Sequence, residues 1–238
     1  MAVLIDYYVS LNSPWTHLGA ARIEALAAQH GAELRIWPVD FGTIFAGSGG
    51  LPLPKRSPQR QAYRMQELQR WRDALSIPIK LQPKYFPANE LPGAAAVIAL
   101  RETQGHAPAI RLAHRILKAL WQEDQDTGDA ATLAALMRDC GLDADALLRL
   151  AEDHQLMQHL AQGLSDIPGL QMEAPQTNIL FIDLVGEAKA KGAALQAHLK
   201  QAGIDVTSLY RLRLVTHLDV DRTGIDRTIA AIRQFFQA

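Results

Sequence analysis

The chain has 238 residues, of which 48% are hydrophobic and 21% are charged, and its formal net charge is −1 at pH 7. This length permits one large domain or two small ones with a sizeable core. A charge near zero gives no basic field for nucleic acid, and no apolar run is long enough to cross a bilayer, so neither nucleic acid nor a membrane is expected as a partner.

The start of the chain and its cysteine content bear on the cellular compartment. Residues 1–6 lack a basic region and reach an acidic residue at Asp6, which predicts a strand and not a signal peptide. The single cysteine, Cys140, excludes an internal disulfide and is typical of a reducing cytosol. We therefore expect a cytoplasmic protein in which Cys140 is an inert thiol near a helix end.

The first stretch predicts a strand followed directly by a helix. The apolar run from Val3 to Val9 is typical of a mostly buried, central parallel strand. Ser13 is a strong N-cap candidate, Pro14 suits the first helical position, and an apolar face continues to Leu26. The free amides at such a helix start, with the positive end of the helix dipole, stabilise an anion by about 0.3–1 kcal/mol.

Ser13 and Thr16 have the spacing at which thiol–disulfide enzymes carry two cysteines. Hydroxyls replace both sulfurs, so this helix can hydrogen-bond a thiolate that a cofactor supplies but cannot exchange disulfides itself. The alternative is that Ser13 is a plain helix cap.

A strand from Glu33 to Val39 and a long loop from Asp40 to Pro58 follow in the prediction. The loop is rich in glycine and proline, a composition typical of functional or disordered segments. Lys55, Arg56 and Arg60 on its far side are cations that can meet carboxylates of a ligand, or they are simply solvated.

A helix from Gln59 to Leu75 is predicted next, with one apolar face made of Tyr63, Leu68, Trp71 and Leu75. Tyr63 is a candidate pocket wall, although an aromatic residue at helical spacing is more often core. In the proline-containing loop that ends at Asn89, this residue either donates to a substrate oxygen or closes a turn.

Two long helical segments are predicted to follow, from Gly93 to Glu123 and from Ala130 to Arg149. His106 and His114 occur there without the spacing of metal ligands. We interpret them as surface or packing residues, and no metal site is predicted.

Several separated motifs in the first two-thirds of the chain resemble a known family. They are Asn12-Ser13-Pro14-Trp15, Leu18-Gly19, Trp37-Pro38 and the segment from Gly49 to Ile79. In this order they resemble 2-hydroxychromene-2-carboxylate isomerase and its relatives, the kappa-class glutathione transferases. The resemblance implies an α/β fold with a thioredoxin-like β-α-β start at 1–149, a helical insertion from about residue 59 to 149, and glutathione as cofactor.

The resemblance also implies roles for individual residues. Ser13 matches the serine that faces the glutathione sulfur, and it is the predicted catalytic residue, with Asn12 and Pro14 as further cofactor contacts. The predicted contacts to an aromatic, carboxylate-bearing substrate are Trp15, Lys55, Arg56, Tyr63 and Asn89.

The last part of the chain, residues 150–238, resembles a different family, the C-terminal domain of low-specificity threonine aldolases. The similar segments are Leu150 to His154, Gly163 to Gly169, Gln176 to Phe181 and Arg211 to Val220. Arg213 matches the arginine that grips the substrate carboxylate in those enzymes. The chain therefore resembles a hybrid that is joined near Arg149.

This tail is predicted to form a small split α/β unit. Its predicted elements are a first helix, a strand from Asn178 to Leu184, a helix from Ala188 to Gln201, a turn at Gly203, a strand pair around Val206 and from Leu212 to Leu218, and a helix from Gly224 to Phe236. Because exposed strand edges favour aggregation, we expect these strands to dock on the first sheet, within one chain or across a homodimer.

The tail also contains residues whose order along the chain suggests a completed glutathione site. Pro175 precedes a strand, as the cis-proline of the isomerase family does, and Asp221 and Arg222 stand near the start of the last helix. The alternative is that Pro175 marks a strand boundary and Asp221 is a helix cap.

Three functions follow from these patterns. The first is a glutathione-dependent isomerase that acts on an aromatic carboxylate, a small-molecule substrate, by reversible thiolate addition. The second is a catalytically inactive hybrid of two enzyme fragments. The third is a fragment of a pyridoxal-phosphate aldolase, which is disfavoured because none of Lys189, Lys191 and Lys200 matches the cofactor lysine.

Overall fold

The computed structural model describes residues 3–175, 177–217 and 219–237, and the chain divides into two compact units, Met1–Leu147 and Leu148–Ala238. Gln176, at the start of an aldolase-like motif, and Leu218, at the end of a predicted strand, lie outside the described residues. Among the described helices, none combines the length and the apolar character that a membrane crossing requires.

The first unit begins with the predicted strand, helix and strand. They are β1 (Leu4–Val9), α1 (Pro14–Gln29) and β2 (Glu33–Pro38). The two strands are parallel and pair in register from Leu4↔Glu33 to Val9↔Pro38. Parallel strands need a crossover connection, and α1 supplies it. This arrangement confirms the β-α-β start.

The prediction that β1 is a mostly buried, central strand is wrong. On one face of β1 the side chains of Leu4 and Tyr8 are 51% and 63% exposed, whereas Val9 on the other face is buried. In the described part of the chain this sheet has two strands, β1 and β2. The exposed fractions indicate that helices cover one face of β1, so a continuous apolar run here does not mean burial on both faces.

The segment from Asp40 to Pro58 was predicted as a loop, but it contains a helix. In α2 (Phe41–Ser48) the Asp40 carboxylate accepts from the Gly42 amide at 2.7 Å and from the Thr43 hydroxyl at 2.6 Å, and Gly49 ends the helix with φ of 73°. A short 3-10 turn, η1 (Leu53–Lys55), follows. Capping at both ends therefore stabilises this helix, although it contains glycine residues that disfavour a helix.

The helical insertion starts with α3 (Pro58–Leu75), whose buried face differs from the prediction. Leu68 is fully buried, whereas Tyr63 and Trp71 are 58% and 44% exposed. Leu68 packs in a cluster with Leu18, Ile79, Leu117, Leu120 and Trp121, and Met65 and Leu75 flank it. The face that α3 buries is thus the Met65–Leu68–Leu75 stripe, which leaves Tyr63 available to a ligand.

Each of the two long predicted helices is in fact a pair. The first pair is α4 (Leu91–Gln104) and α5 (His106–Trp121), and the second is α6 (Ala130–Asp139) and α7 (Ala144–Leu164). The chain between them passes through Gly105 with φ of 88° and Gly141 with φ of 74°. Glycine enters this left-handed region at little cost, so these two residues interrupt the helical pattern.

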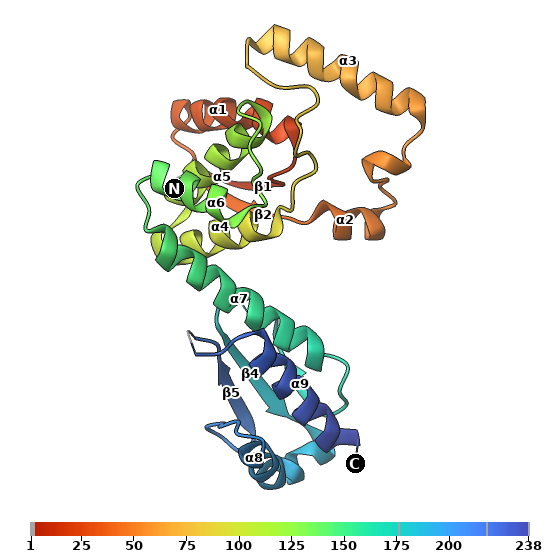
Figure 1. The fold of residues 1–238 in the computed structure, drawn as a ribbon, viewed down its shortest axis with the longest axis vertical. Coiled ribbons are helices and arrows are strands. Elements are labelled where there is room, and N and C mark those ends of the chain that lie inside the picture. Colours follow the sequence, from red (N-terminus) through yellow and green to blue (C-terminus); the bar gives the residue numbers. More distant parts are fainter. Residues whose placement is uncertain (1–2, 176, 218, 238) are drawn as a thin grey trace. The chain divides into compact units, whose positions relative to one another are not determined.

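Helices α1, α4 and α5 gather around β1 and β2 (Figure 1), and side chains of α4 and α5 form hydrogen bonds with the backbone of β2. The Ile36 amide donates to His106 Nδ1 at 3.1 Å, and Arg101 Nη1 donates to the Ile36 carbonyl at 3.4 Å. His106 is therefore a packing residue that satisfies a strand edge, as the sequence predicted.

His114 and His17 are held inside the first unit by hydrogen bonds. His114 Nδ1 lies 2.5 Å from Glu24 Oε1, and its Nε2 lies 3.3 Å from the Tyr7 hydroxyl. Burial raises the pKa of Tyr7 to about 12 and lowers the pKa of His114. His17 Nε2 lies 3.2 Å from the Pro78 carbonyl, and burial lowers the pKa of His17 too.

We expect the first unit to lose stability as the pH falls below about 6.5. Because burial lowers the pKa of both histidines below the usual value of about 6.5, the unfolded chain binds more protons in this range. All four tryptophans lie in the first unit, so urea unfolding followed by tryptophan fluorescence reports on it. The midpoint should be lower at pH 5.5 than at pH 7.5, and His17→Gln should reduce this difference; equal midpoints would contradict the prediction.

The second unit is an antiparallel sheet with helices. Its elements after α7 are β3 (Leu170–Met172), β4 (Ile179–Leu184), the 3-10 helix η2 (Gly186–Lys191), α8 (Gly192–Gln201), β5 (Arg211–Val215) and α9 (Arg222–Gln237). The strand order is β3-β4-β5, with both pairs antiparallel. This unit confirms the predicted small split α/β unit after the helical insertion.

One core cluster holds the second unit together. It includes Leu160 of α7, Ile182 of β4, Leu199 of α8, Leu212 of β5 and Ile232 of α9, each at most 1% exposed. Figure 1 shows α7 and α9 beside β4 and β5. Each helix therefore buries an apolar stripe against the sheet.

Two details of the predicted tail are wrong. Val206 is buried but lies in no strand, and the partner of β4 on its other side is β3, with Met172 opposite Ile182. Among the described strands, those of each unit pair within their own sheet, so none of β3, β4 and β5 extends the first sheet as expected. Pairing across a homodimer stays a prediction.

Candidate functional site

The predicted catalytic serine lies at the start of α1. Ser13 has the extended backbone of an N-cap residue, and its Oγ accepts from the Thr16 amide at 3.2 Å. Because Oγ is the acceptor in this contact, its own proton stays available for donation. Pro14 has no amide hydrogen, and no hydrogen bond to the Trp15 amide occurs among the described residues. This helix start therefore offers two adjacent donors, the Ser13 hydroxyl and the Trp15 amide.

Hydrogen bonds from the loop before α4 hold the turn that precedes Ser13. Asn12 Nδ2 donates to the Ala88 carbonyl at 2.8 Å, and Asn12 Oδ1 accepts from the Ala88 amide at 3.1 Å. Glu90 Oε2 accepts from the buried Ser10 hydroxyl at 2.7 Å and from the Asn12 amide at 3.1 Å. The Asn12 side chain is thus occupied by the backbone, which gives it a role in positioning the turn.

A pocket of about 390 Å³ lies between the start of α1 and α3. It is lined by Trp15, Arg56, Gln59, Arg60, Tyr63, Arg64 and Glu67. The structure thus brings three predicted substrate contacts, Trp15, Arg56 and Tyr63, into one pocket. It does not bring in Lys55, which is exposed at the end of η1 and is not part of this lining.

The charge of this pocket is mainly positive. Arg56 Nε donates to the Leu51 carbonyl at 2.8 Å, which directs its side chain. The carboxylate that lines the pocket, Glu67, bonds to Arg70 at 2.6 Å. Arg64 and Glu67 were missed at the sequence level, although the spacing of four from Arg60 to Arg64 could have shown that the two arginines share a helix face.

Asn89 lies apart from this pocket, in an open depression formed with the Lys84–Ala88 loop and residues 126–129. Its Oδ1 accepts from the Leu91 amide at 3.3 Å, which is the turn-closing contact that the sequence allowed. A contact between Asn89 and a substrate stays a prediction.

The remaining predicted cofactor contacts belong to the second unit. In the described residues the cis peptide bond is Phe86–Pro87, so the expectation of a cis-proline at Pro175 is wrong. Pro175 follows β3 in the antiparallel unit and lines a depression with residues of α7. Asp221 Oδ1 accepts from the Gly224 amide at 2.8 Å, and Arg222 Nε lies 3.6 Å from Asp226 Oδ1. Both contacts are typical of a helix start. Their role toward glutathione stays a prediction.

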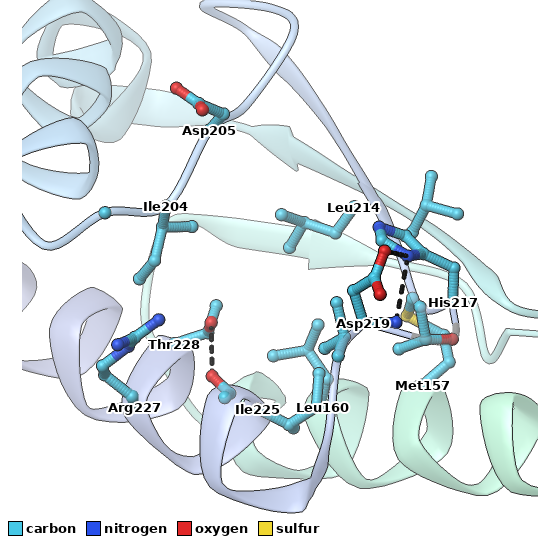
Figure 2. A pocket seen from close by; sticks show the side chains of 15 residues that line it. Met157, Leu160, Ile204, Asp205, Leu214, His217, Asp219, Ile225, Arg227 and Thr228 are labelled. Carbon is cyan, nitrogen blue, oxygen red and sulfur yellow. Dashed lines mark hydrogen bonds and ion pairs between the residues drawn. The ribbon is translucent and has the colours of Figure 1, made fainter.

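The second unit has a pocket of its own, of about 320 Å³ (Figure 2). Its floor is apolar, with Met157, Leu160 and Leu214, and charged groups such as Asp219 and Arg227 stand around it. None of the predicted site residues lines it. Arg213, the residue that matches the aldolase arginine, is exposed on the β5 face opposite the buried Leu212 and Leu214.

Cys140 does not add a reactive group to either pocket. It forms the C-cap of α6, and burial raises the pKa of its thiol. A raised pKa keeps the thiol protonated and unreactive at neutral pH. The prediction of an inert cysteine near a helix end is consistent with this position.

Known proteins are similar to both parts of the chain. The family description "DSBA-like thioredoxin domain" matches residues 4–171. The 2-hydroxychromene-2-carboxylate isomerase of Sphingobium xenophagum is 30% identical over 149 residues, which are 62% of this chain and 73% of that protein. The low-specificity L-threonine aldolase of Escherichia coli K12 is 32% identical over 111 residues, which are 46% of this chain and 32% of the aldolase.

A solved structure of a 2-hydroxychromene-2-carboxylate isomerase has a similar fold. The TM-score is 0.50 at 23% identity, and the similarity covers 61% of this chain and 69% of that one. Both resemblances predicted from the sequence are therefore confirmed, although this chain spans only about a third of the aldolase.

Proposed function

Because this chain belongs to the DSBA-like thioredoxin domain family and is a distant homologue of 2-hydroxychromene-2-carboxylate isomerase, we propose that it is a glutathione-dependent isomerase that acts on an aromatic carboxylate. The observation that supports the proposal most directly is the helix start at Ser13. There the Ser13 hydroxyl and the Trp15 amide are the available donors, and the Trp15 side chain lines the pocket, although Ser13 itself is not part of that lining.

The residues at this helix start suit a thiol cofactor. Glutathione supplies a sulfur nucleophile that adds reversibly to a conjugated carbon–carbon double bond and leaves again after rotation about it. Ser13 donates its hydroxyl proton to the anionic form of the sulfur, and the free end of the sixteen-residue helix α1 favours the same negative charge. Asn12 and Pro14 fix the backbone that aims these donors.

The pocket beside it suits the other reactant. Trp15 and Tyr63 offer aromatic faces to a planar ring, and Arg56 offers a cation to its carboxylate. Lys55, the exposed neighbour of Arg56 in the chain, adds a second positive charge, which steers the acid toward the pocket. A reducing cytoplasm is the compartment that suits this chemistry.

A second candidate is a catalytically inactive hybrid. It is favoured by the two-stranded sheet of the first unit, whose β1 has a hydrogen-bonded strand on one side only in the part of the chain that the structure describes. In this candidate the residues that the isomerase family supplies from its C-terminal part have no functional replacement in Pro175, Asp221 and Arg222.

Binding and turnover assays separate the two candidates. We expect glutathione to raise the unfolding free energy of the full chain by about 1.4 kcal/mol at ten times its Kd. S-methylglutathione, which cannot form a thiolate, should bind more weakly. The chain should also catalyse the glutathione-dependent isomerisation of 2-hydroxychromene-2-carboxylate. Absence of a stability change at millimolar glutathione would favour the inactive hybrid, and binding without isomerisation would overturn the proposed reaction.

A further inference from the structure

Arg64 is a partly buried cation that forms no ion pair with a carboxylate among the described residues. It lies on α3, and its guanidinium carbon is 5.4 Å from the centre of the Phe86 ring. Its Nη1 is 3.8 Å from the sulfur of Met65. None of the ion pairs in the described part of the chain includes Arg64. Removing a charge from water is costly unless an opposite charge compensates for it.

The surroundings of Arg64 add to this excess of positive charge. Arg56 and Arg60 line the same pocket, and Glu67, the carboxylate of that lining, bonds to Arg70 instead. Burial and the nearby Arg56 charge both lower the pKa of Arg64. Three arginines line one pocket and the carboxylate of that lining is engaged elsewhere, which indicates that the pocket lacks an anion.

The uncharged side chains of the pocket limit the kind of molecule that can carry this anion. Trp15 and Tyr63 are both exposed aromatic side chains, although each belongs to a helix that buries other residues. A volume of about 390 Å³ is within the range of small-molecule sites. Aromatic walls and a set of arginine forks together fit a flat ring that carries a carboxylate, because a guanidinium binds a carboxylate through two parallel hydrogen bonds.

We propose that Arg64 is the specificity-determining residue of this pocket, and that it receives the carboxylate of a planar aromatic acid whose ring lies against Trp15 and Tyr63. Its position on α3 supports this role, since Met65 and Leu68 anchor the helix in the core cluster next to it. The more exposed Arg60 and the backbone-bound Arg56 strengthen the positive field without being the main ligand. The inference refines the substrate contact of the proposed function, but binding of the acid does not require glutathione.

Calorimetry on the full chain without glutathione tests the proposal. The probes are 2-naphthoate and the uncharged 2-naphthamide, which have the same ring. The chain should bind the acid at least tenfold more tightly than the amide. Arg64→Met, which keeps an unbranched side chain against Phe86, should weaken acid binding by about 10- to 100-fold and leave amide binding nearly unchanged. Arg64→Lys should restore part of the preference, because it restores the charge but not the fork.

Arg72→Met is the matched control. Arg72 is on the same helix and pairs with Asp73 outside the pocket, so the variant has the same loss of charge and should keep the preference for the acid. Retained preference in Arg64→Met, or no binding of the acid to the unmodified chain, would overturn the proposal. It would also be overturned if S-methylglutathione displaced the acid and Arg64→Met weakened only S-methylglutathione, since the pocket would then hold a carboxylate of the cofactor. Acid binding without any glutathione binding would overturn the proposed function instead and leave this inference standing.

Discussion

Replacing Ser13 with alanine is expected to raise the pKa of the bound glutathione thiol by about 1 to 2 pH units and to lower turnover at pH 7 by about 10- to 100-fold. A hydrogen bond to a charged group contributes about 1.5–3 kcal/mol, and 1.36 kcal/mol corresponds to one pH unit. The Ser13 hydroxyl donates this bond in the proposed site, and alanine has no donor. The amide of Trp15 and the dipole of α1 remain in the variant, so the thiol pKa should stay below that of free glutathione.

The variant also removes the N-cap of α1, which by itself costs about 1 kcal/mol of stability. Asp143→Ala is a matched control for this loss, because the Asp143 carboxylate accepts from the Ala146 amide at 3.0 Å at the start of α7 and Asp143 does not line the pocket. Thiolate absorbance against pH gives the thiol pKa, and initial rates give the turnover. If Ser13→Ala and Asp143→Ala lose similar stability and neither changes the thiol pKa, Ser13 is only a helix cap.

The parts of the fold that the sequence predicted well are those set by neighbouring residues. The start of α1 follows from Ser13 and Pro14, because both the cap and the proline act within one helical turn. The burial of β1 could not be predicted in this way, since it depends on which elements cover each face of the sheet. The buried face of α3 is a similar case: Tyr63 and Leu68 both suit an amphipathic helix, and only the packing of Leu68 against α1 and α5 decides between them.

The same distinction applies to the candidate site. Trp15 and Tyr63 were predicted from motifs, and the structure places both in one pocket. Arg64 was missed because its importance comes from the lack of an ion-pair partner among the described residues, since the nearby Glu67 pairs with Arg70, and a sequence does not display this. For Asn89 the sequence left a substrate contact and a turn as alternatives; its Oδ1 accepts from the Leu91 amide at 3.3 Å, which is the turn contact, and a substrate contact stays a prediction.

Replacing Asn12 with alanine should lower the unfolding free energy of the first unit by about 1–3 kcal/mol and weaken glutathione binding in proportion to the disorder of the turn. The Asn12 side chain makes two hydrogen bonds, of 2.8 and 3.1 Å, to the Ala88 backbone, and each contributes about 0.5–1.5 kcal/mol. These bonds tie the β1–α1 turn to the loop before α4, so their loss frees the backbone that aims Ser13.

The nearly isosteric Asn12→Asp tests the donor role of the Asn12 side chain separately from its acceptor role. Aspartate keeps the acceptor for the Ala88 amide but turns a lone pair toward the Ala88 carbonyl, next to the carboxylate of Glu90. It should therefore destabilise the turn at least as much as alanine at pH 7, and less at a pH where the new carboxyl is protonated.

Asn89→Ala is the matched control, since it removes a neighbouring amide whose Oδ1 accepts a single 3.3 Å bond from the Leu91 amide. Urea unfolding followed by tryptophan fluorescence measures the first unit, and calorimetry measures glutathione binding. Equal unfolding midpoints for Asn12→Ala and Asn89→Ala would show that the Ser10–Glu90 contact holds the turn without the Asn12 side chain.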